Sequence, residues 1–268
     1  MKKLLVCLLA LCLITGCSGK TSGAALSGTV LTDGSTSMEK VMGALIEGFR
    51  EVESGVTVNY SGTGSGSGIE AVLSGTCDIG LSSRELKDSE VEKGAVGHTV
   101  ALDGVAIVVH PENPISGLSR ADLAAIFTGE VTNWAQLGGS DAPIAVYGRE
   151  AGSGTRSAFE EILGVTDQCR YTNEYSSTGD VIGSIASNPN GIGYASLSSV
   201  TDSVKALTVD GAACTEDTVR DGSYPIQRPF LLVTKEGAEF SDAARAFLDY
   251  ALSDAVAEYI SIAGAVAP

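Results

Sequence analysis

The sequence of 268 residues predicts an α/β fold with mostly parallel sheets. Short apolar strands alternate with amphipathic helices along the chain, the pattern of parallel strands joined by crossover helices. Loops rich in serine and glycine fall where several strands lead into helices. Hydrophobic residues make up 44% and charged residues 19%, so the chain can pack a core, and residues 18–268 are enough for two compact lobes.

The first 17 residues have the layout of a secretory signal. A charged start, Met1-Lys2-Lys3, precedes the apolar run 4–13, which is too short to span a bilayer. Ile14-Thr15-Gly16-Cys17 then resembles a bacterial lipobox, in which a lipid is attached to the cysteine. We expect residues 1–17 to be a lipoprotein signal peptide with Cys17 as the lipidation site, and residues 18–27 to be a tether. The alternative is an ordinary signal peptide that merely contains Cys17.

The rest of the chain is predicted as an alternation of strands and helices. Strands are expected at residues 28–32, 56–60, 77–81, 105–109, 144–147, 191–195, 205–209 and 229–234. Helices are expected at residues 38–49, 69–73, 119–127, 157–163, 178–187 and 242–252. Ligands of such folds bind beyond the carboxyl ends of the strands, where the polar loops fall.

Three of these loops predict an anion site. They are Asp33-Gly34-Ser35-Thr36-Ser37, the alternating Ser/Thr-Gly run 61–68, and Arg149-Glu150-Ala151-Gly152-Ser153-Gly154-Thr155-Arg156. Small residues at a helix start let backbone N–H groups converge on an anion, and the helix dipole favours negative charge there. Arg149 adds a planar, charged fork suited to phosphate oxygens. The alternatives are ordinary helix caps and, for residues 61–68, a flexible linker.

The net charge and the absence of enzyme motifs reduce the number of functions that fit this sequence. The net charge is −16, and it becomes −18 without Lys2 and Lys3, which argues against a nucleic-acid partner. An anion site in such a chain must use local dipoles and hydrogen bonds. No nucleophile elbow, P-loop or dinucleotide fingerprint occurs, and His98 and His110 lack a metal-ligand spacing. We therefore expect a binding protein without cofactor or metal, not an enzyme.

Three cysteines remain beyond residue 17, namely Cys77, Cys169 and Cys214. An odd number in an exported chain leaves at least one free thiol or an intermolecular bond. A Cys169–Cys214 bridge is one pairing that this leaves open. Cys77 is expected to be a small core residue.

Two further segments complete a resemblance to a known family. They are Cys77-Asp78-Ile79-Gly80-Leu81-Ser82-Ser83-Arg84 and Ile126-Phe127-Thr128-Gly129-Glu130-Val131-Thr132-Asn133-Trp134, and they stand in the expected order with the lipobox and the three loops. The chain resembles the phosphate-binding proteins of bacterial high-affinity phosphate ABC transporters over essentially its whole mature length. Its size is similar to the compact form of Gram-positive bacteria.

The resemblance implies a two-lobe periplasmic-binding-protein fold of type II, with a hinge and a ligand cleft between the lobes. Lobe one would comprise residues 28–102 and 229–268, and lobe two residues 103–228. The implied function is extracytoplasmic binding of inorganic phosphate by a monomer, anchored to the cell membrane by its lipid, that delivers the phosphate to a membrane permease. The implied phosphate-binding residues are Ser35, Thr36, Ser65, Asp78, Arg149, Ser153, Gly154 and Thr155.

Two positions, 78 and 151, bear most directly on how the resemblance implies that phosphate is bound. Asp78 matches a buried carboxylate, which would accept a hydrogen bond from protonated phosphate and would repel sulfate, which has no proton to donate. Ala151 departs from the enterobacterial pattern, which has an aspartate there that buttresses the arginine. The alternatives left open are a binder of sulfate, molybdate or tungstate, an exported phosphatase, and a phosphate sensor or adhesin.

Overall fold

The computed structural model describes residues 26–268. The predictions for the signal peptide, for Cys17 and for most of the tether concern residues outside this range. The first half of the described chain contains β1 (Gly28–Gly34), η1 (Thr36–Met38), α1 (Glu39–Val52), β2 (Val56–Gly62), α2 (Ser65–Ser74), β3 (Ile79–Ser82), α3 (Asp88–Val91), β4 (Ala95–Val109), β5 (Gly117–Leu118), α4 (Arg120–Thr128) and η2 (Trp134–Leu137).

The second half begins with the strand that precedes the arginine loop. It contains β6 (Ala145–Arg149), α5 (Gly154–Leu163), β7 (Asn173–Tyr175), α6 (Thr178–Ala186), β8 (Gly191–Ser196), η3 (Leu197–Ser199), β9 (Lys205–Ala206), β10 (Thr208–Val209), α7 (Glu216–Arg220), β11 (Gln227–Lys235), α8 (Asp242–Ala251), η4 (Asp254–Val256) and α9 (Ala257–Ile262). The α/β class is confirmed, and most predicted strands and helices are found with bounds that shift by a few residues. Two strands differ more: the one predicted at 105–109 begins ten residues earlier, and the one predicted at 205–209 is two short strands, β9 and β10.

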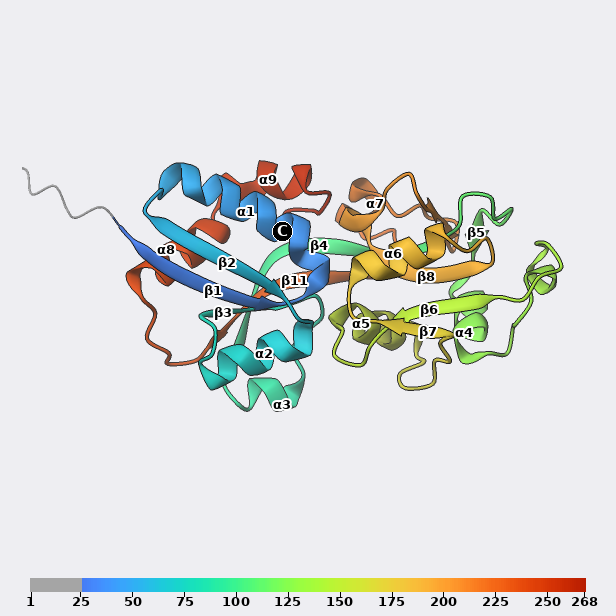
Figure 1. The fold of residues 1–268 in the computed structure, drawn as a ribbon, viewed down its shortest axis with the longest axis horizontal. Coiled ribbons are helices and arrows are strands. Elements are labelled where there is room, and N and C mark those ends of the chain that lie inside the picture. The colour runs from blue at the N-terminus through green and yellow to red at the C-terminus, as the bar shows by residue number, and fades with distance from the viewer. Residues whose placement is uncertain (1–25) are drawn as a thin grey trace, which may run out of the picture.

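Strand pairing divides the fold into two parts, which lie side by side in Figure 1. The main path of paired strands runs β2-β1-β3-β11-β4-β8-β6-β7. At one end β1 pairs in parallel with β2 and β3, and at the other end β6 pairs in parallel with β7 and β8. The middle pairs, β3 with β11, β11 with β4, and β4 with β8, are antiparallel. Each part is thus a parallel sheet with helices, and antiparallel strands join the two.

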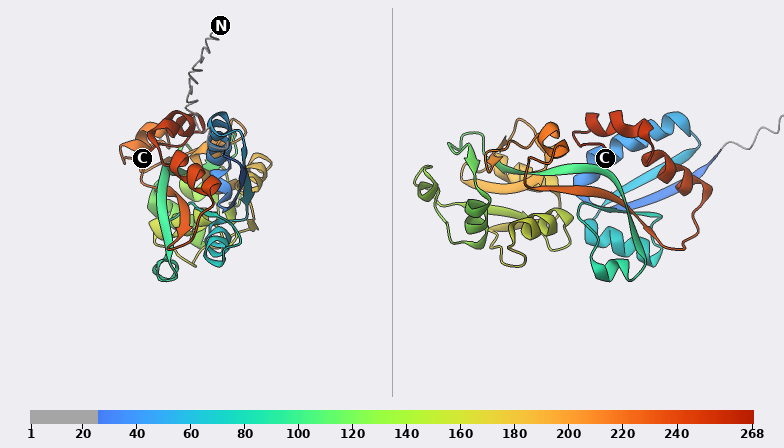
Figure 2. Two further views of the ribbon diagram at one scale, coloured as in Figure 1. Left: turned by 90° about the vertical axis from the view of Figure 1, so that its left-hand side faces the viewer. Right: turned by 180° about the vertical axis from the view of Figure 1, so that it is seen from behind.

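The long strands β4 and β11 carry the chain from one part to the other, as the rear view in Figure 2 shows. Residues 95–104 of β4 pair with β11, up to Asp103 opposite Arg228 and Gly104 opposite Gln227, and residues 105–109 pair with β8. Sequence patterning predicted only residues 105–109 as a strand here. The stretch 95–104 includes His98, Thr99 and Asp103 and has no clean alternation, so its strand structure depends on the pairing with β11.

Two large apolar cores correspond to the two parts. One contains buried side chains from residues 105–226 together with Val266, and the other contains buried side chains from residues 30–101 and 230–265. The division into lobes at 102/103 and 228/229 stays a prediction; apart from Val266, the buried residues of the two cores lie on either side of it.

The structure does not contain the disulfide bridge that the sequence left open. Cys77, Cys169 and Cys214 are all free thiols, so there is no Cys169–Cys214 bridge in the structure. Cys214 is buried against Gly104 of β4, where an added Cβ would lie 2.5 Å from its sulfur. Within residues 26–268, no helix has the length and apolar character needed to cross a membrane.

Candidate functional site

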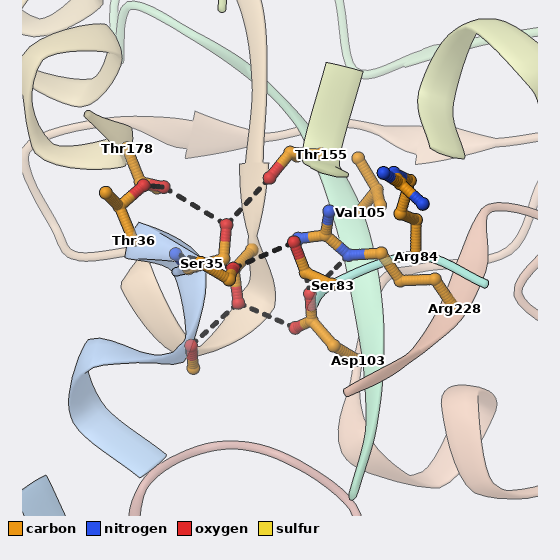
Figure 3. A network of polar contacts seen from close by, with 12 residues as sticks. Ser35, Thr36, Ser83, Arg84, Asp103, Val105, Thr155, Thr178 and Arg228 are labelled. Carbon is orange, nitrogen blue, oxygen red and sulfur yellow. Dashed lines mark hydrogen bonds and ion pairs between the residues drawn. The ribbon is translucent and has the colours of Figure 1, made fainter. Parts of the chain in front are cut away.

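Hydroxyl side chains from both parts of the fold form one buried cluster, part of which is shown in Figure 3. Its members follow the carboxyl ends of β1, β2, β3, β6 and β7, and all are 3% exposed or less. We call it the hydroxyl cluster; it consists of Ser35, Ser37, Ser65, Ser83, Thr155 and Thr178. Because parallel strands end at the same edge, loops distant in sequence meet here.

Direct hydrogen bonds join the cluster. Ser35 Oγ donates to Ser83 Oγ at 2.8 Å, and Ser65 Oγ lies 3.3 Å from the same atom. Ser37 Oγ lies 2.7 Å from Thr155 Oγ1 and 3.1 Å from Thr178 Oγ1. Each hydroxyl can donate one hydrogen bond and accept two, so the cluster can present both donors and acceptors to a small polar ligand.

Several of these contacts link the two parts of the fold. Besides the Ser37 contacts, Thr36 Oγ1 lies 3.3 Å from Thr178 Oγ1. The backbone N–H of Gly66, in the first turn of α2, donates to the carbonyl oxygen of Gly152 at 3.1 Å. The loops of the two parts therefore touch around the cluster, which is a closed arrangement.

The glycine at the start of α5 is required by this close approach. A Cβ at Gly154 would contact the side-chain oxygen of Ser65 and would lie 2.8 Å from that of Ser83. The preceding residue, Ser153, is the N-cap of α5, and its Oγ accepts a hydrogen bond from the backbone N–H of Arg156 at 3.3 Å. Ser153 is buried, but its hydroxyl already serves as a helix cap. The first N–H groups of α5 have no partner within the helix, and they start beside the cluster.

Arg149 ends β6 and reaches the cluster with its side chain. Its guanidinium donates to the carbonyl oxygens of Tyr175 (Nε, 3.0 Å) and Ser176 (2.6 Å), and to Thr178 Oγ1 (3.0 Å). The side chain is only 2% exposed. Burial lowers the pKa of Arg149 to about 10, so the guanidinium is still charged at neutral pH.

No carboxylate is needed to hold Arg149 in this position. Carbonyl oxygens between β7 and α6 orient the guanidinium, and Ala151 is an exposed residue of the loop. The backbone N–H of Arg149 donates to the hydroxyl of buried Tyr194 at 3.1 Å, which supports the end of β6. The β7–α6 segment thus supplies the hydrogen-bond acceptors that hold Arg149, and the positive charge of Arg149 is left without an acidic hydrogen-bond partner.

Asp78 does not belong to the cluster. It precedes β3, where its Oδ2 accepts a hydrogen bond from the backbone N–H of Leu31 at 2.7 Å. The cluster member Ser83 follows the other end of the same strand, and five residues of extended chain span roughly 16 Å. Asp78 instead lines a surface pocket together with Cys77 and Lys235. The expectation of a carboxylate inside the anion site does not fit this geometry, because the aspartate lies at the wrong end of β3.

The structure therefore brings together most of the residues that the sequence singled out. Ser35, Thr36, Ser65, Arg149, Gly154 and Thr155 meet at the cluster, and Asp78 lies elsewhere. Ser153 directly precedes Gly154 and Thr155, and its hydroxyl caps α5, so its role as a phosphate-binding residue stays a prediction. Sequence reasoning missed Ser37, Ser83 and Thr178. The signal that could have found them is the carboxyl-end rule itself, since each follows a strand end that faces the cluster.

Comparisons with known proteins agree with this architecture. A family model described as a PBP superfamily domain matches residues 19–255. The phosphate-binding protein PstS of Bacillus subtilis (strain 168) is 34% identical over 239 residues, which cover 87% of this chain and 78% of that protein. PstS of Borreliella burgdorferi is 28% identical over 232 residues, covering 82% of this chain and 83% of that protein.

Solved structures give the same result. A putative phosphate ABC transporter substrate-binding protein from Clostridium perfringens, with bound phosphate, has a TM-score of 0.87 and 37% identity, and covers 90% of this chain and 100% of its own. An ABC-type phosphate transport receptor from Vibrio cholerae has a TM-score of 0.73 and 32% identity, and covers 89% of this chain and 100% of its own.

The fold consists of two α/β parts, and the polar loops at their strand ends meet between them. Together with the family match over most of the chain, this makes the protein a member of the PBP superfamily. Within it, this chain belongs to the PstS family of phosphate-binding proteins, as the similarity to the Bacillus subtilis protein over most of both chains shows. The resemblance drawn from the loops and from segments 77–84 and 126–134 is thereby confirmed.

Proposed function

We propose that this protein binds inorganic phosphate outside the cytoplasm and delivers it to the permease of an ABC transporter. One observation carries the proposal: buried hydroxyls and helix starts from both parts of the fold meet at the charged guanidinium of Arg149. The relatives named above as phosphate-binding proteins, one of them solved with phosphate, support the choice of ligand.

The site would hold phosphate by local interactions and not by the field of the whole molecule. The chain carries a net charge of −16, which repels anions at long range. Arg149 supplies a charged, planar donor, the starts of α2 and α5 supply backbone N–H groups, and the hydroxyls of Ser35, Ser65 and Thr155 supply further hydrogen bonds. Phosphate would replace the contacts that the cluster hydroxyls now make with each other.

Selectivity must rest on groups other than Asp78. A hydroxyl oxygen whose own proton is engaged elsewhere in the cluster can accept a hydrogen bond from the P–OH group of HPO₄²⁻, which sulfate cannot donate. A neutral acceptor repels sulfate less than a carboxylate would, and this keeps sulfate as a second candidate ligand.

Calorimetry of the unliganded protein with phosphate, sulfate and molybdate at equal ionic strength tests the proposal. We expect the tightest binding for phosphate. Binding of sulfate or molybdate with phosphate excluded would overturn the assignment and would favour the oxyanion alternative.

We propose that the protein binds phosphate without catalysing a reaction. We also propose that it acts as a monomer and has no nucleic-acid partner. In residues 26–268 the cluster hydroxyls contact one another and Arg149, and none of them donates to an imidazole or carboxylate that could serve as a base. Release of phosphate from phosphomonoesters by the purified protein would contradict this, and equilibrium sedimentation tests the monomer.

We also propose that Cys17 carries a lipid anchor and that residues 18–27 form the tether to the cell membrane. The lipobox-like Ile14-Thr15-Gly16-Cys17 supports this. Membrane fractionation and mass spectrometry of the processed protein test it. Cys17→Ser should release the protein from the membrane, whereas an unchanged distribution of this variant would rule the anchor out.

A further inference from the structure

A second arginine lies beside the hydroxyl cluster, on the strand that crosses between the two parts. Arg228 belongs to β11, opposite Asp103 of β4. It is 4% exposed, and its Nε and one terminal nitrogen donate to Asp103 Oδ2 at 3.1 and 2.9 Å. Its other terminal nitrogen is buried and has no hydrogen-bond partner within the described part of the chain.

An unpartnered guanidinium nitrogen is costly when buried, because it has lost its water and gained nothing in return. Such an atom in a native protein calls for an explanation, and a ligand that arrives later is one. Asp103 cannot be that partner, because its Oδ1 accepts from Ser196 Oγ at 2.7 Å and its Oδ2 already accepts from the two other nitrogens of Arg228.

The position of Arg228 relates it to the cluster. Strand β11 pairs with β3 up to Leu231 opposite Ser82, so Arg228 lies just beyond the carboxyl end of β3, where Ser83 is found. In the view of Figure 3 the guanidinium of Arg228 points toward Ser83, whereas the guanidinium of Arg84 points away from the network. Burial is the main cause of the lowered pKa of Arg149, and the positive charge of Arg228 lowers this pKa further, in keeping with two guanidinium groups at one site.

The buried charges beside the cluster favour an anion, whereas Glu150 and Asp180, which also act on Arg149, are exposed to solvent. Arg149 has no acidic hydrogen-bond partner, and Arg228 is neutralised only by Asp103. These three side chains leave one positive charge in a desolvated region, inside a protein whose net charge is −16. An oxyanion would relieve this imbalance and would satisfy the free nitrogen of Arg228.

We infer that Arg228 is a second charged ligand-binding residue, which donates from its free terminal nitrogen to the bound oxyanion while Asp103 holds the guanidinium in place. This inference rests on the proposed phosphate binding. It also joins the ligand to the crossing strands β4 and β11, because the bonded pair Asp103–Arg228 spans them.

The test is phosphate calorimetry on the full mature protein and on a charge-neutral pair, Asp103→Asn with Arg228→Gln. The neutral pair removes both buried charges together, so no unpaired charge is left behind. We expect its dissociation constant for phosphate to rise at least about tenfold, the effect of one lost charge-assisted hydrogen bond. Thermal unfolding without phosphate verifies that the variant is folded.

The matched control is a second arginine–carboxylate pair, whose arginine directly follows the cluster member Ser83. Arg84 donates with two nitrogens to Glu90 at 2.7 and 2.8 Å, and the two side chains are 6% and 15% exposed. Arg84→Gln with Glu90→Gln should leave phosphate affinity within about twofold of wild type, since this guanidinium does not face the cluster.

The outcomes separate the two proposals. Wild-type affinity in the Asp103/Arg228 neutral pair, with wild type binding phosphate, would overturn the role of Arg228 alone. No phosphate binding by wild type would overturn both proposals. If the neutral pair does not fold, Arg228→Lys is measured instead, because it keeps the charge beside Asp103 but lacks the second arm of the fork. Wild-type affinity in that variant would overturn the inference, and a loss of about fivefold or more with unchanged melting would support it.

Discussion

Removing the Arg149 guanidinium is the most direct perturbation of the proposed site. The guanidinium has five N–H donors, and three of them are used on Tyr175 O, Ser176 O and Thr178 Oγ1. Two donors therefore remain for a ligand. Each charge-assisted hydrogen bond contributes roughly 1.5–3 kcal/mol, so Arg149→Ala should cost about 3–6 kcal/mol of binding free energy. The dissociation constant for phosphate should rise on the order of 10²- to 10⁴-fold.

The same change also removes support from the protein itself. The acceptors at Tyr175, Ser176 and Thr178 lose their partner, which should lower the free energy of unfolding of the unliganded protein by about 1–3 kcal/mol. Binding must therefore be measured by calorimetry on protein shown to be folded, with urea unfolding as the parallel measurement. Arg149→Lys should recover part of the affinity, because it keeps the charge but loses the fork.

Arg120→Ala is the control for a simple loss of positive charge. Arg120 pairs with Asp210 at 2.6 Å, and its side chain is 52% exposed on the part of the fold that also carries Arg149. Its removal should leave phosphate affinity unchanged within about twofold, because exposed ion pairs contribute little and are screened by salt. A loss below tenfold in folded Arg149→Ala would refute the reasoning, because it would mean that the guanidinium does not contact the ligand.

Four further outcomes follow from the geometry. Asp78→Asn should leave phosphate affinity and sulfate exclusion unchanged in calorimetry, because Asp78 lies at the far end of β3; a marked loss of discrimination would bring it back into the site. Ser37→Ala removes the contacts to Thr155 and Thr178 that join the two parts and should weaken phosphate binding roughly five- to tenfold; an unchanged dissociation constant would show that this contact does not stabilise the closed form. The pKa of Arg149, lowered to about 10 by burial, predicts nearly equal affinities at pH 8 and pH 9. The affinity should be about twofold lower near pH 10, where half of the guanidinium groups are uncharged, and should fall further above it; a severalfold loss by pH 9 would point to another titrating group. In small-angle scattering, phosphate should reduce the radius of gyration through closure about β4 and β11, and sulfate at equal ionic strength should not; an unchanged radius at saturating phosphate would mean that closure does not accompany binding.

The sequence determined the class of fold and most of the loops of the site. Local signals were sufficient to predict these elements, because each signal involves residues that are close in sequence. These signals are the periodicity of strands and helices, serine caps, and small residues at helix starts. The run 149–156 predicted a charged hydrogen-bond donor followed by a helix start. The structure shows why residue 154 is glycine, since no side chain fits there against Ser65 and Ser83. Family likeness then indicated phosphate as the ligand.

The general rule of strand carboxyl ends was available from the sequence, but only the tertiary structure decided which residues of each segment reach the site and which distant residues join them. Asp78 and Ser83 belong to one short segment, and sequence alone chose the aspartate, whereas the pairing of β3 with β1 and β11 puts Ser83 at the cluster. Arg228 is separated from Arg149 by 79 positions and stands in an apolar strand without a motif, so only the register of β11 with β4 pairs it with Asp103. The physical reason is that periodicity reports which face of an element is buried, whereas a ligand site depends on long-range strand pairing, which no local pattern encodes.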